Sequence, residues 1–318
     1  VEVNALLEAF HRRSPVSGLA SGQTELRAQG DTLSGLFRSL KTRSVLQVER
    51  AKILRLDLDK AIKSLGEDRA GQTPLYAYDR SALDARIGEL RAALPRAVKL
   101  HYAMKANPMP ALVAYMAARV DGLDVASGRE LKVALDAGAD PHEMSFAGPG
   151  KSEAELTQAI AAGVLLNVES FREARLLADL SARHGWPARV AVRINPDFEL
   201  KSSGMKMGGG PKQFGVDAEQ VPELLREIGR LGLAFEGFHL YAGSQNLKAE
   251  SICEAQVKSY DLALRLAADA PAPVRTLNLG GGFGIPYFPG ELPLDLAPVG
   301  DNLSHLVERA ARELPQAG

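Results

Sequence analysis

A lysine follows a strand-forming segment at the point where the chain must turn. Residues 98–103 carry β-forming side chains, Lys105 comes two positions later, and Asn107-Pro108 follows. Proline disfavours helical angles in the residue before it, so we expect the strand to end here. At the carboxyl end of a barrel strand, a desolvated lysine could form a Schiff base with an aldehyde cofactor. The alternative is a surface lysine that merely follows a strand.

An arginine, Arg193, stands inside an otherwise apolar run over residues 190–194. A buried guanidinium is costly without an anionic partner. That partner could be a carboxylate or phosphate at the mouth of a barrel, or the side chain of an internal acid. The glycine-rich loop over 204–215 comes after this strand, and such a loop is a candidate lid or substrate contact.

Two later strand ends carry groups that suit a flat or anionic ligand. Alternation places His239 and Tyr241 on one face of a strand over 235–242, where an aromatic ring could stack on a flat cofactor. The run Gly280 to Gly282 follows a strand over 276–279, and successive glycines can aim several N–H groups at an anion. The alternatives are a core histidine and a flexible loop.

Two other strand ends have simpler interpretations. Asp124 and Ser127 end a strand over 122–126, and Ser127 could equally cap the following helix. The segment Gly148-Pro149-Gly150-Lys151-Ser152 lacks the spacing of a Walker phosphate loop, and we interpret it as a turn from strand to helix.

The elements that position these residues alternate regularly after Thr73. Capping-box pairs mark several helix starts, namely Ser127/Glu130, Ser152/Glu155 and Ser170/Glu173. Strands are expected at 98–103, 122–126, 144–147, 164–168, 190–194, 235–242 and 276–279, and helices at 80–94, 108–119, 128–137, 153–162, 171–184, 217–231, 250–269 and 301–313. Such alternation predicts a parallel sheet. Seven βα units favour a (β/α)8 TIM barrel over a doubly wound sheet, truncated before strand 8 because no candidate for that strand precedes Gly318.

Composition narrows the class of protein. The 318 residues include 38 basic and 39 acidic ones, and a formal net charge of −1 gives no footprint for nucleic acid or an anionic membrane. No apolar run has the length of a membrane span. The single cysteine, Cys253, excludes an intrachain disulfide framework and a thiolate zinc cluster, and it fits a reducing cytoplasm. Because the chain starts without a methionine or signal peptide, we expect a fragment.

The N-terminal part is harder to interpret. Residues 1–70 form a segment of uncertain structure, and residues 71–318 form the predicted barrel domain, with the boundary expected near 66–71. Short helical character occurs over 3–10. The pattern over 45–65 fits a helix and a strand equally well, so it decides neither.

Seven motifs in order make residues 73–318 resemble the barrel domain of the fold-type III pyridoxal-phosphate decarboxylases, the family of diaminopimelate and ornithine decarboxylases. This domain has the barrel of the alanine racemase-like type. Because the order and the spacing of the motifs both agree, the resemblance is specific. The matching segments are 102–107, 124–131, 148–151, 167–170, 193–196, 243–245 and 280–284.

The resemblance implies a pyridoxal 5'-phosphate site and decarboxylation of an amino acid. Lys105 would hold the cofactor as a Schiff base, Asp124 would orient the site, and Ser244 would lie at the phosphate. The residues that the resemblance implies around the cofactor are Lys105, Asp124, Arg193, His239, Tyr241, Ser244, Gly280, Gly281 and Gly282.

One position departs from the family pattern. Most members have a histidine two residues before the Gly-Ser pair, and here that residue is Tyr241, while His239 matches an earlier histidine. The change keeps a flat π surface and removes an ionisable one. It resembles the branch associated with exosortase and exopolysaccharide gene systems, which leaves the amino-acid substrate open between diaminopimelate and a related compound.

The resemblance also implies parts that this sequence lacks. An acidic partner of the ring nitrogen on strand 8 and a C-terminal β-domain would lie beyond Gly318, and the family's active site is shared across a homodimer. We therefore expect this polypeptide alone to be inactive. The alternatives are a racemase-like enzyme of the same barrel type and a non-catalytic pyridoxal-phosphate-binding protein.

Overall fold

The computed structural model describes residues 16–27, 41–53, 78–198, 205–206 and 213–317. The chain divides into two compact units, Val1–Tyr78 and Asp79–Gly318, which we describe separately. The boundary predicted near 66–71 lies outside the described residues, as does the helical character predicted over 3–10.

The described part of the first unit is an antiparallel pair of long strands. Strand β1 (Val16–Arg27) pairs with β2 (Lys41–Ile53), from Val16 opposite Ile53 to Arg27 opposite Lys41. The ambiguous pattern over 45–65 is therefore a strand as far as Ile53, and the rest of it lies outside the described residues. The sequence pattern does not predict β1, because its serines and glycines obscure the alternation that marks a strand.

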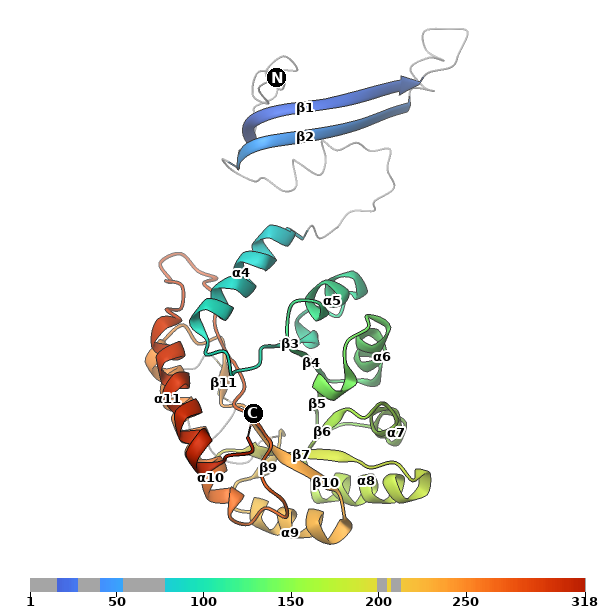
Figure 1. Cartoon of the computed structure of the whole chain (residues 1–318), viewed down its shortest axis with the longest axis vertical. Coiled ribbons are helices and arrows are strands. Elements are labelled where there is room, and N and C mark those ends of the chain that lie inside the picture. The colour runs from blue at the N-terminus through green and yellow to red at the C-terminus, as the bar shows by residue number, and fades with distance from the viewer. Residues whose placement is uncertain (1–15, 28–40, 54–77, 199–204, 207–212, 318) are drawn as a thin grey trace. The chain divides into compact units, whose positions relative to one another are not determined.

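The second unit is built on a curved parallel sheet (Figure 1). Neighbouring strands follow the order β12-β10-β7-β6-β5-β4-β3, and the short β9 pairs with β7 beyond this path. A two-stranded pair, β8 (Met205–Lys206) with β11 (Gly243–Ser244), lies apart from the sheet. The strands of the main sheet are β3 (His101–Ala103), β4 (Gly122–Val125), β5 (Met144–Phe146), β6 (Leu165–Val168), β7 (Arg189–Asn195), β9 (Val216–Asp217), β10 (Ala234–Leu240) and β12 (Thr276–Asn278).

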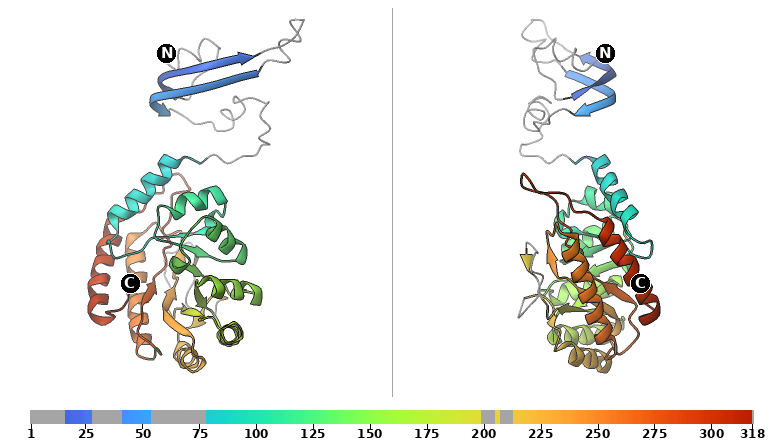
Figure 2. Two further views of the ribbon diagram at one scale, coloured as in Figure 1. Left: turned by 45° about the vertical axis from the view of Figure 1, so that its right-hand side comes forward. Right: turned by 90° about the vertical axis from the view of Figure 1, so that its left-hand side faces the viewer.

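Helices follow the strands and cover the outside of the curve (Figures 1 and 2). Two short 3₁₀ turns, η1 (Met104–Ala106) and η2 (Pro141–Glu143), lie next to strands. The helices are α4 (Arg80–Ala93), α5 (Pro110–Ala117), α6 (Gly128–Asp136), α7 (Glu153–Ala162), α8 (Phe171–His184), α9 (Val221–Leu231), α10 (Ala249–Ala267) and α11 (Ala297–Glu313). None of the helices that the structure describes is long and apolar enough to cross a membrane.

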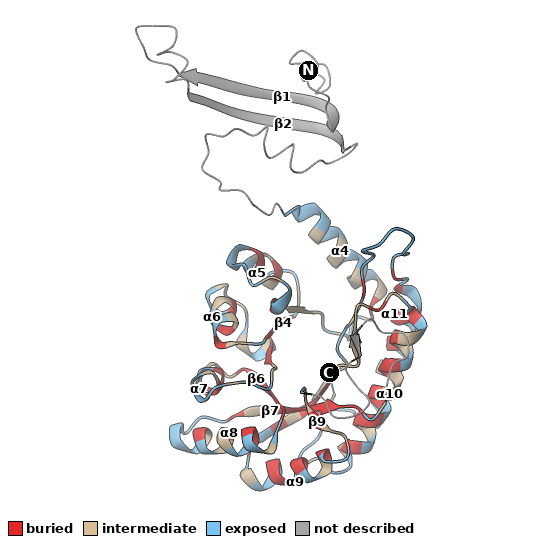
Figure 3. Ribbon diagram, turned by 180° about the vertical axis from the view of Figure 1, so that it is seen from behind, coloured by how far each residue is buried: buried red, intermediate tan, exposed pale blue. Residues whose placement is uncertain are grey.

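This arrangement confirms the predicted β/α barrel architecture. Within the described residues β3 and β12 each pair on one side only, so the barrel is open between them, in agreement with the predicted incomplete barrel. Buried residues lie along the strands and on the helix faces turned toward them (Figure 3). The core is mostly aliphatic, with Phe146, Phe238 and Tyr260 among its largest fully buried side chains.

The chain after β3 differs slightly from the predicted pattern. The helix expected to begin at residue 108 begins at Pro110. Asn107 stays extended, with φ −164° and ψ 105°, because proline follows it. Its side-chain Oδ1 then accepts a hydrogen bond from the Met109 N–H at 3.0 Å. Lys105 lies in η1, which directly follows β3, so it is near the end of the strand as predicted.

The three predicted capping boxes form to different extents. Ser152 and Glu155 form the full reciprocal box at the start of α7. Ser127 and Ser170 cap α6 and α8 through their hydroxyl oxygens. In these two helices the acidic side chain accepts instead from the N–H of the residue before the cap, which is Ala126 for Glu130 and Glu169 for Glu173.

Substitution of Ser152 by alanine should destabilise the second unit by about 1 kcal/mol, because the Glu155 N–H loses its acceptor. Denaturant unfolding of the wild type and the Ser152→Ala variant measures this difference. Substitution of Ser304, whose hydroxyl donates to the Gly300 carbonyl inside α11, serves as the control and should cost less. Equal stability of Ser152→Ala and wild type would contradict the capping role.

Candidate active site

Lys105, the predicted Schiff-base lysine, lies beside an aromatic ring from the other side of the open barrel. Lys105 is exposed in the turn after β3, and Tyr241 follows β10. The Nζ atom of Lys105 lies 5.3 Å from the centroid of the Tyr241 ring, within the range of a cation–π contact. The carboxyl ends of β3 and β10 therefore meet at one site, as the predicted barrel required.

Tyr241 also connects the lysine to the glycine-rich loop. Its hydroxyl and the Ser244 Oγ are 2.9 Å apart and share a hydrogen bond. Gly280 has φ +70°, and a Cβ atom there would lie 2.7 Å from Cδ2 of Tyr241, so only glycine allows the ring to pack this closely. Lys105, Tyr241, Ser244 and Gly280 thus form one continuous group.

The glycine loop after β12 presents free backbone donors. The Gly280 N–H donates to Oδ1 of Asn278 at 2.8 Å. Among the described residues, no hydrogen bond engages the N–H groups of Gly281 and Gly282. The space around Gly281 is open, since a Cβ atom there would meet nothing within 4 Å. Two unpaired amides next to a serine hydroxyl can bind an anion.

A hydrogen-bonded chain of polar side chains crosses the inner face of the sheet from β3 to β6. Oδ1 of Asp124 accepts from Ser145 Oγ at 2.9 Å and lies 3.1 Å from Nδ1 of His101, and Nδ2 of Asn167 donates to Ser145 Oγ at 3.2 Å. Burial acts to raise the pKa of Asp124, but the hydrogen bond and charge of His101 outweigh it. The net pKa of Asp124 is below its ordinary value, so this carboxylate stays ionised.

Arg193 pairs with an internal acid, which is one of the two partners that the sequence left open. Its Nη1 donates to Oε1 of Glu169 at 3.0 Å, and both side chains are almost fully buried. The same carboxylate accepts from the N–H groups of Gly148 at 2.5 Å and Gly215 at 3.0 Å. The guanidinium also lies 4.8 Å from the centroid of the Phe214 ring. Glu169 therefore ties together the segments that follow β5, β6 and β7.

His239 lies between these groups. It pairs in register with Arg193 of β7 on one side and with Asn278 of β12 on the other. Its Nδ1 is buried and has no hydrogen-bond partner among the described residues. Burial, aided by the charge of Arg193, lowers the pKa of His239 to about 4. His239 is therefore neutral at neutral pH.

This shift predicts a pH dependence of stability. Between pH 6.5 and about 4 the unfolded chain binds a proton at His239 that the native protein does not, so the free energy of unfolding should decrease as pH falls. His239→Gln should remove up to about 3 kcal/mol of that decrease. Denaturant unfolding of both proteins at about pH 7 and about pH 4.5 measures the difference.

Glu173 acts in the opposite direction, because burial raises its pKa above the ordinary value. Both proteins contain Glu173, so the comparison isolates His239. Parallel pH profiles for the wild type and His239→Gln would contradict the buried neutral state of this histidine.

A buried ion pair supports the turn after β5. The Nζ atom of Lys151 lies 2.5 Å from Oε1 of Glu173, and Nζ also donates to the carbonyls of Gly148 and Asn167 at 2.6 and 3.0 Å. Lys151 thus fixes the turn from strand to helix and is not part of a phosphate loop, in agreement with the sequence interpretation.

Four residues of this network have no role predicted from the sequence, namely His101, Ser145, Asn167 and Glu169, and Glu173 is predicted only as the acid of a capping box. Of these, Asn167 and Glu169 are part of a recognised motif, and their position at the carboxyl end of a buried strand was the available signal. Ser145 gave no signal, because a lone serine in a strand is common. Most of the candidate lid over 204–215 lies outside the described residues.

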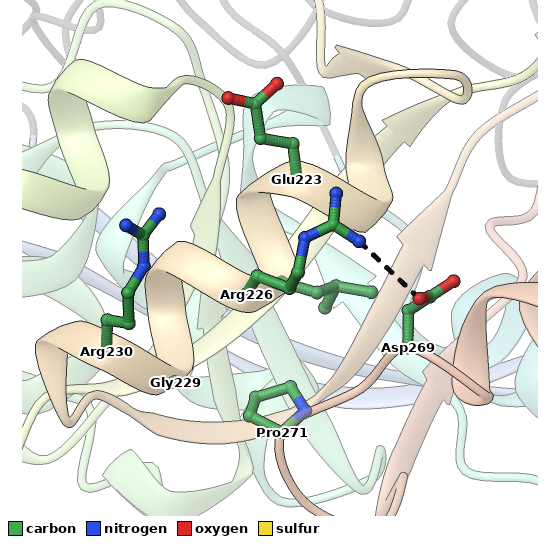
Figure 4. Close-up of a pocket in the computed structure, with 7 residues that line it drawn as sticks. Glu223, Arg226, Gly229, Arg230, Asp269 and Pro271 are labelled. Atoms are coloured by element: carbon green, nitrogen blue, oxygen red, sulfur yellow. Dashed lines mark ion pairs between the residues drawn. The ribbon is translucent and has the colours of Figure 1, made fainter.

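A surface recess lies away from this group. It has a volume of about 640 Å³ and lies between α9 and the segment after α10 (Figure 4). Arg226 and Asp269 form an exposed ion pair across it, at 3.7 Å. Residues 229–230 and 269–271 precede β10 and β12, so this recess is at the amino ends of the strands. It is separate from the group around Lys105.

Comparisons with known proteins show the family of this chain. Residues 80–317 match the family model of the pyridoxal-dependent decarboxylase, pyridoxal binding domain. The chain is 35% identical over 241 residues to L-glutamyl-[BtrI acyl-carrier protein] decarboxylase of Niallia circulans. It is 36% identical over 248 residues to diaminopimelate decarboxylase of Aquifex aeolicus. These alignments cover 75% and 76% of this chain.

A solved structure is similar as well. Diaminopimelate decarboxylase from Helicobacter pylori, complexed with L-lysine, superposes with a TM-score of 0.68 and 28% identity, over 81% of this chain and 64% of that one. The chain spans 56% and 58% of the length of the relatives from Niallia circulans and Aquifex aeolicus. The family model covers the whole described βα-barrel, from α4 to α11. The chain therefore belongs to the pyridoxal-dependent decarboxylase family, of which it contains the pyridoxal-binding domain.

Proposed function

We propose that this barrel holds pyridoxal 5'-phosphate at Lys105 and that the protein is a carboxy-lyase that decarboxylates a small amino acid. The observation that carries the proposal is the convergence of three features at one end of the strands. These are the exposed amine of Lys105, the Tyr241 ring 5.3 Å from it, and the unpaired amides of Gly281 and Gly282. The match to the pyridoxal-binding domain supports it.

The donor set suits this cofactor. The Ser244 hydroxyl and the two glycine amides can bind the phosphate. The flat face of Tyr241 can pack against a pyridine ring. The buried Nδ1 of His239 lacks a partner among the described residues and is available to a polar group of a ligand. These features accommodate an anionic, aromatic aldehyde.

When bound, pyridoxal phosphate supplies an aldehyde that captures amines and a ring that accepts electrons. The residues of this chain then have separate tasks. Lys105 supplies the amine, and Ser244 with the glycine amides holds the phosphate. Asp124, which is ionised, and His239, which is neutral, keep fixed protonation states near the lysine. Arg193 adds a positive charge whose position Glu169 sets.

The names of the relatives support a proposal for the substrate class. One is named for diaminopimelate and another for a glutamyl group attached to an acyl-carrier protein, so we propose an α-amino acid that is either free or carrier-bound. We further propose that the protein is a homodimer and acts in the cytoplasm. The thiol of Cys253 is free, which suits a reducing compartment.

Borohydride reduction tests the cofactor site directly. The chain is incubated with pyridoxal phosphate, reduced and digested, and the peptides are mapped by mass spectrometry. A pyridoxyl group on Lys105 supports the proposal, whereas its presence on another lysine, or on none, contradicts it.

Carbon dioxide release tests the reaction. It is measured for the protein as encoded by its natural gene, with a panel of free amino acids and a glutamyl carrier conjugate. Racemised amino acid without carbon dioxide would favour a racemase, and an adduct on Lys105 without turnover would favour a non-catalytic pyridoxal-phosphate-binding protein.

A further inference from the structure

Four hydrogen bonds join the loop after β10 to the loop after β12. The Asn246 N–H donates to the Gly282 carbonyl at 2.9 Å, and the Gly284 N–H donates to the Asn246 carbonyl at 2.8 Å. The side-chain amide of Gln245 makes the other two. Its Oε1 accepts from the Ile285 N–H at 3.2 Å, and its Nε2 donates to the Ile285 carbonyl. Gln245 thus extends a backbone pairing by one rung.

The backbone of Gln245 is held in an unfavourable conformation. Its φ of +54° makes it the one non-glycine residue with positive φ among those that the structure describes. A Cβ atom disfavours this left-handed region, so the surroundings must hold the residue there. The two hydrogen bonds of its side chain and the two backbone hydrogen bonds of the adjacent Asn246 restrain it there.

The glycines of the loop after β12 allow the two loop backbones to lie close together. A Cβ atom on Gly282, which has φ +79°, would collide with the carbonyl of Gly243. A Cβ atom on Gly284 would lie 2.9 Å from the carbonyl oxygen of Asn246. Gly281 alone of this group faces open space. The loops therefore form one unit, with Ser244 on one side and the free amides on the other.

We infer that Gln245 is a positioning residue that sets the separation between the Ser244 hydroxyl and the amides of Gly281 and Gly282. This inference rests on the proposed cofactor site and deepens it. The side chain of Gln245 is directed to the backbone of Ile285 and acts through the loops. Its effect should therefore appear in recognition of the phosphate and not of the aromatic ring.

The test compares pyridoxal phosphate with pyridoxal, which lacks the phosphate. Dissociation constants for both are measured by absorbance titration with wild type, Gln245→Ala and Gln245→Gly. Both variants should lose about tenfold of the preference for pyridoxal phosphate, as expected for two hydrogen bonds, while pyridoxal affinity is unchanged. Gln220→Ala, at the exposed start of α9, is the matched control and should keep the full preference.

Gln245→Gly separates positioning from stability. Glycine accepts a positive φ without strain, whereas alanine does not. The melting temperature of Gln245→Gly should therefore be closer to that of the wild type than the melting temperature of Gln245→Ala. A positioning role predicts that Gln245→Gly loses phosphate preference nonetheless.

The outcomes distinguish the two proposals. Retention of the wild-type preference in both Gln245 variants, or equal weakening of both ligands, would overturn the inference and leave the proposed function standing. Failure of the wild type to bind either ligand would overturn the proposed function itself.

Discussion

Substitution of Lys105 by alanine is expected to reduce the borohydride-stable pyridoxyl adduct to the background of surface lysines. The reason is that Lys105 is the amine at the site formed by Tyr241, Ser244 and the glycine loop. Lys105→Arg should behave in the same way, because a guanidinium stays protonated and cannot form a Schiff base. The readout is the mass of the intact chain after reduction, with peptide mapping of the adduct.

The control for Lys105 is Lys132→Ala. Lys132 is an exposed lysine on α6, paired with Asp136 at 2.6 Å, and its loss should leave the adduct unchanged. Non-covalent binding of pyridoxal phosphate should persist in Lys105→Ala, since the phosphate contacts remain. A full adduct yield in Lys105→Ala would place the reactive amine elsewhere and would overturn the proposed site.

Substitution of Glu169 by alanine is expected to cost about 3 to 5 kcal/mol of unfolding free energy. It removes the carboxylate partner of the buried Arg193 and the acceptor of the Gly148 and Gly215 amides. An unpaired charge and two unpaired donors would then be left inside the protein. Denaturant-induced unfolding at neutral pH measures the loss.

A double-mutant cycle with Arg193→Ala isolates the pair. Because both single substitutions disrupt the same contact, the double variant should be far less destabilised than the sum of the two. Glu153→Ala breaks an exposed ion pair with Arg183 and should cost less than about 1 kcal/mol. If Glu169→Ala also lost less than about 1 kcal/mol of unfolding free energy, the Glu169 carboxylate would not hold the segments after β5, β6 and β7 together.

The architecture of the second unit could be predicted from the sequence. Short apolar runs followed by capped amphipathic helices repeat along it, and such local patterns predict strands, helices and their parallel pairing. Every predicted strand of this unit is present. Strand β3 begins three residues later than expected, at His101, and the other strand ends lie within two residues of their expected positions. The motifs around Lys105, Ser244 and Gly280 could also be recognised in the sequence. Glycine, proline and lysine at a strand end each have a local reason to be there, so the sequence alone indicates them.

Other features depended on contacts between distant segments. Arg193 could pair with an internal acid or bind an anionic ligand, and Glu169 decides between these two. Glu169 is 24 positions away in sequence and lies next to Arg193 only in the folded sheet. The side-chain hydrogen bonds of Gln245 to the backbone of Ile285 likewise join residues 40 positions apart. The order of the elements and the residue types at their ends follow from local sequence patterns. Which of those residues pair is seen only in the folded chain, because pairing depends on strand register and on burial.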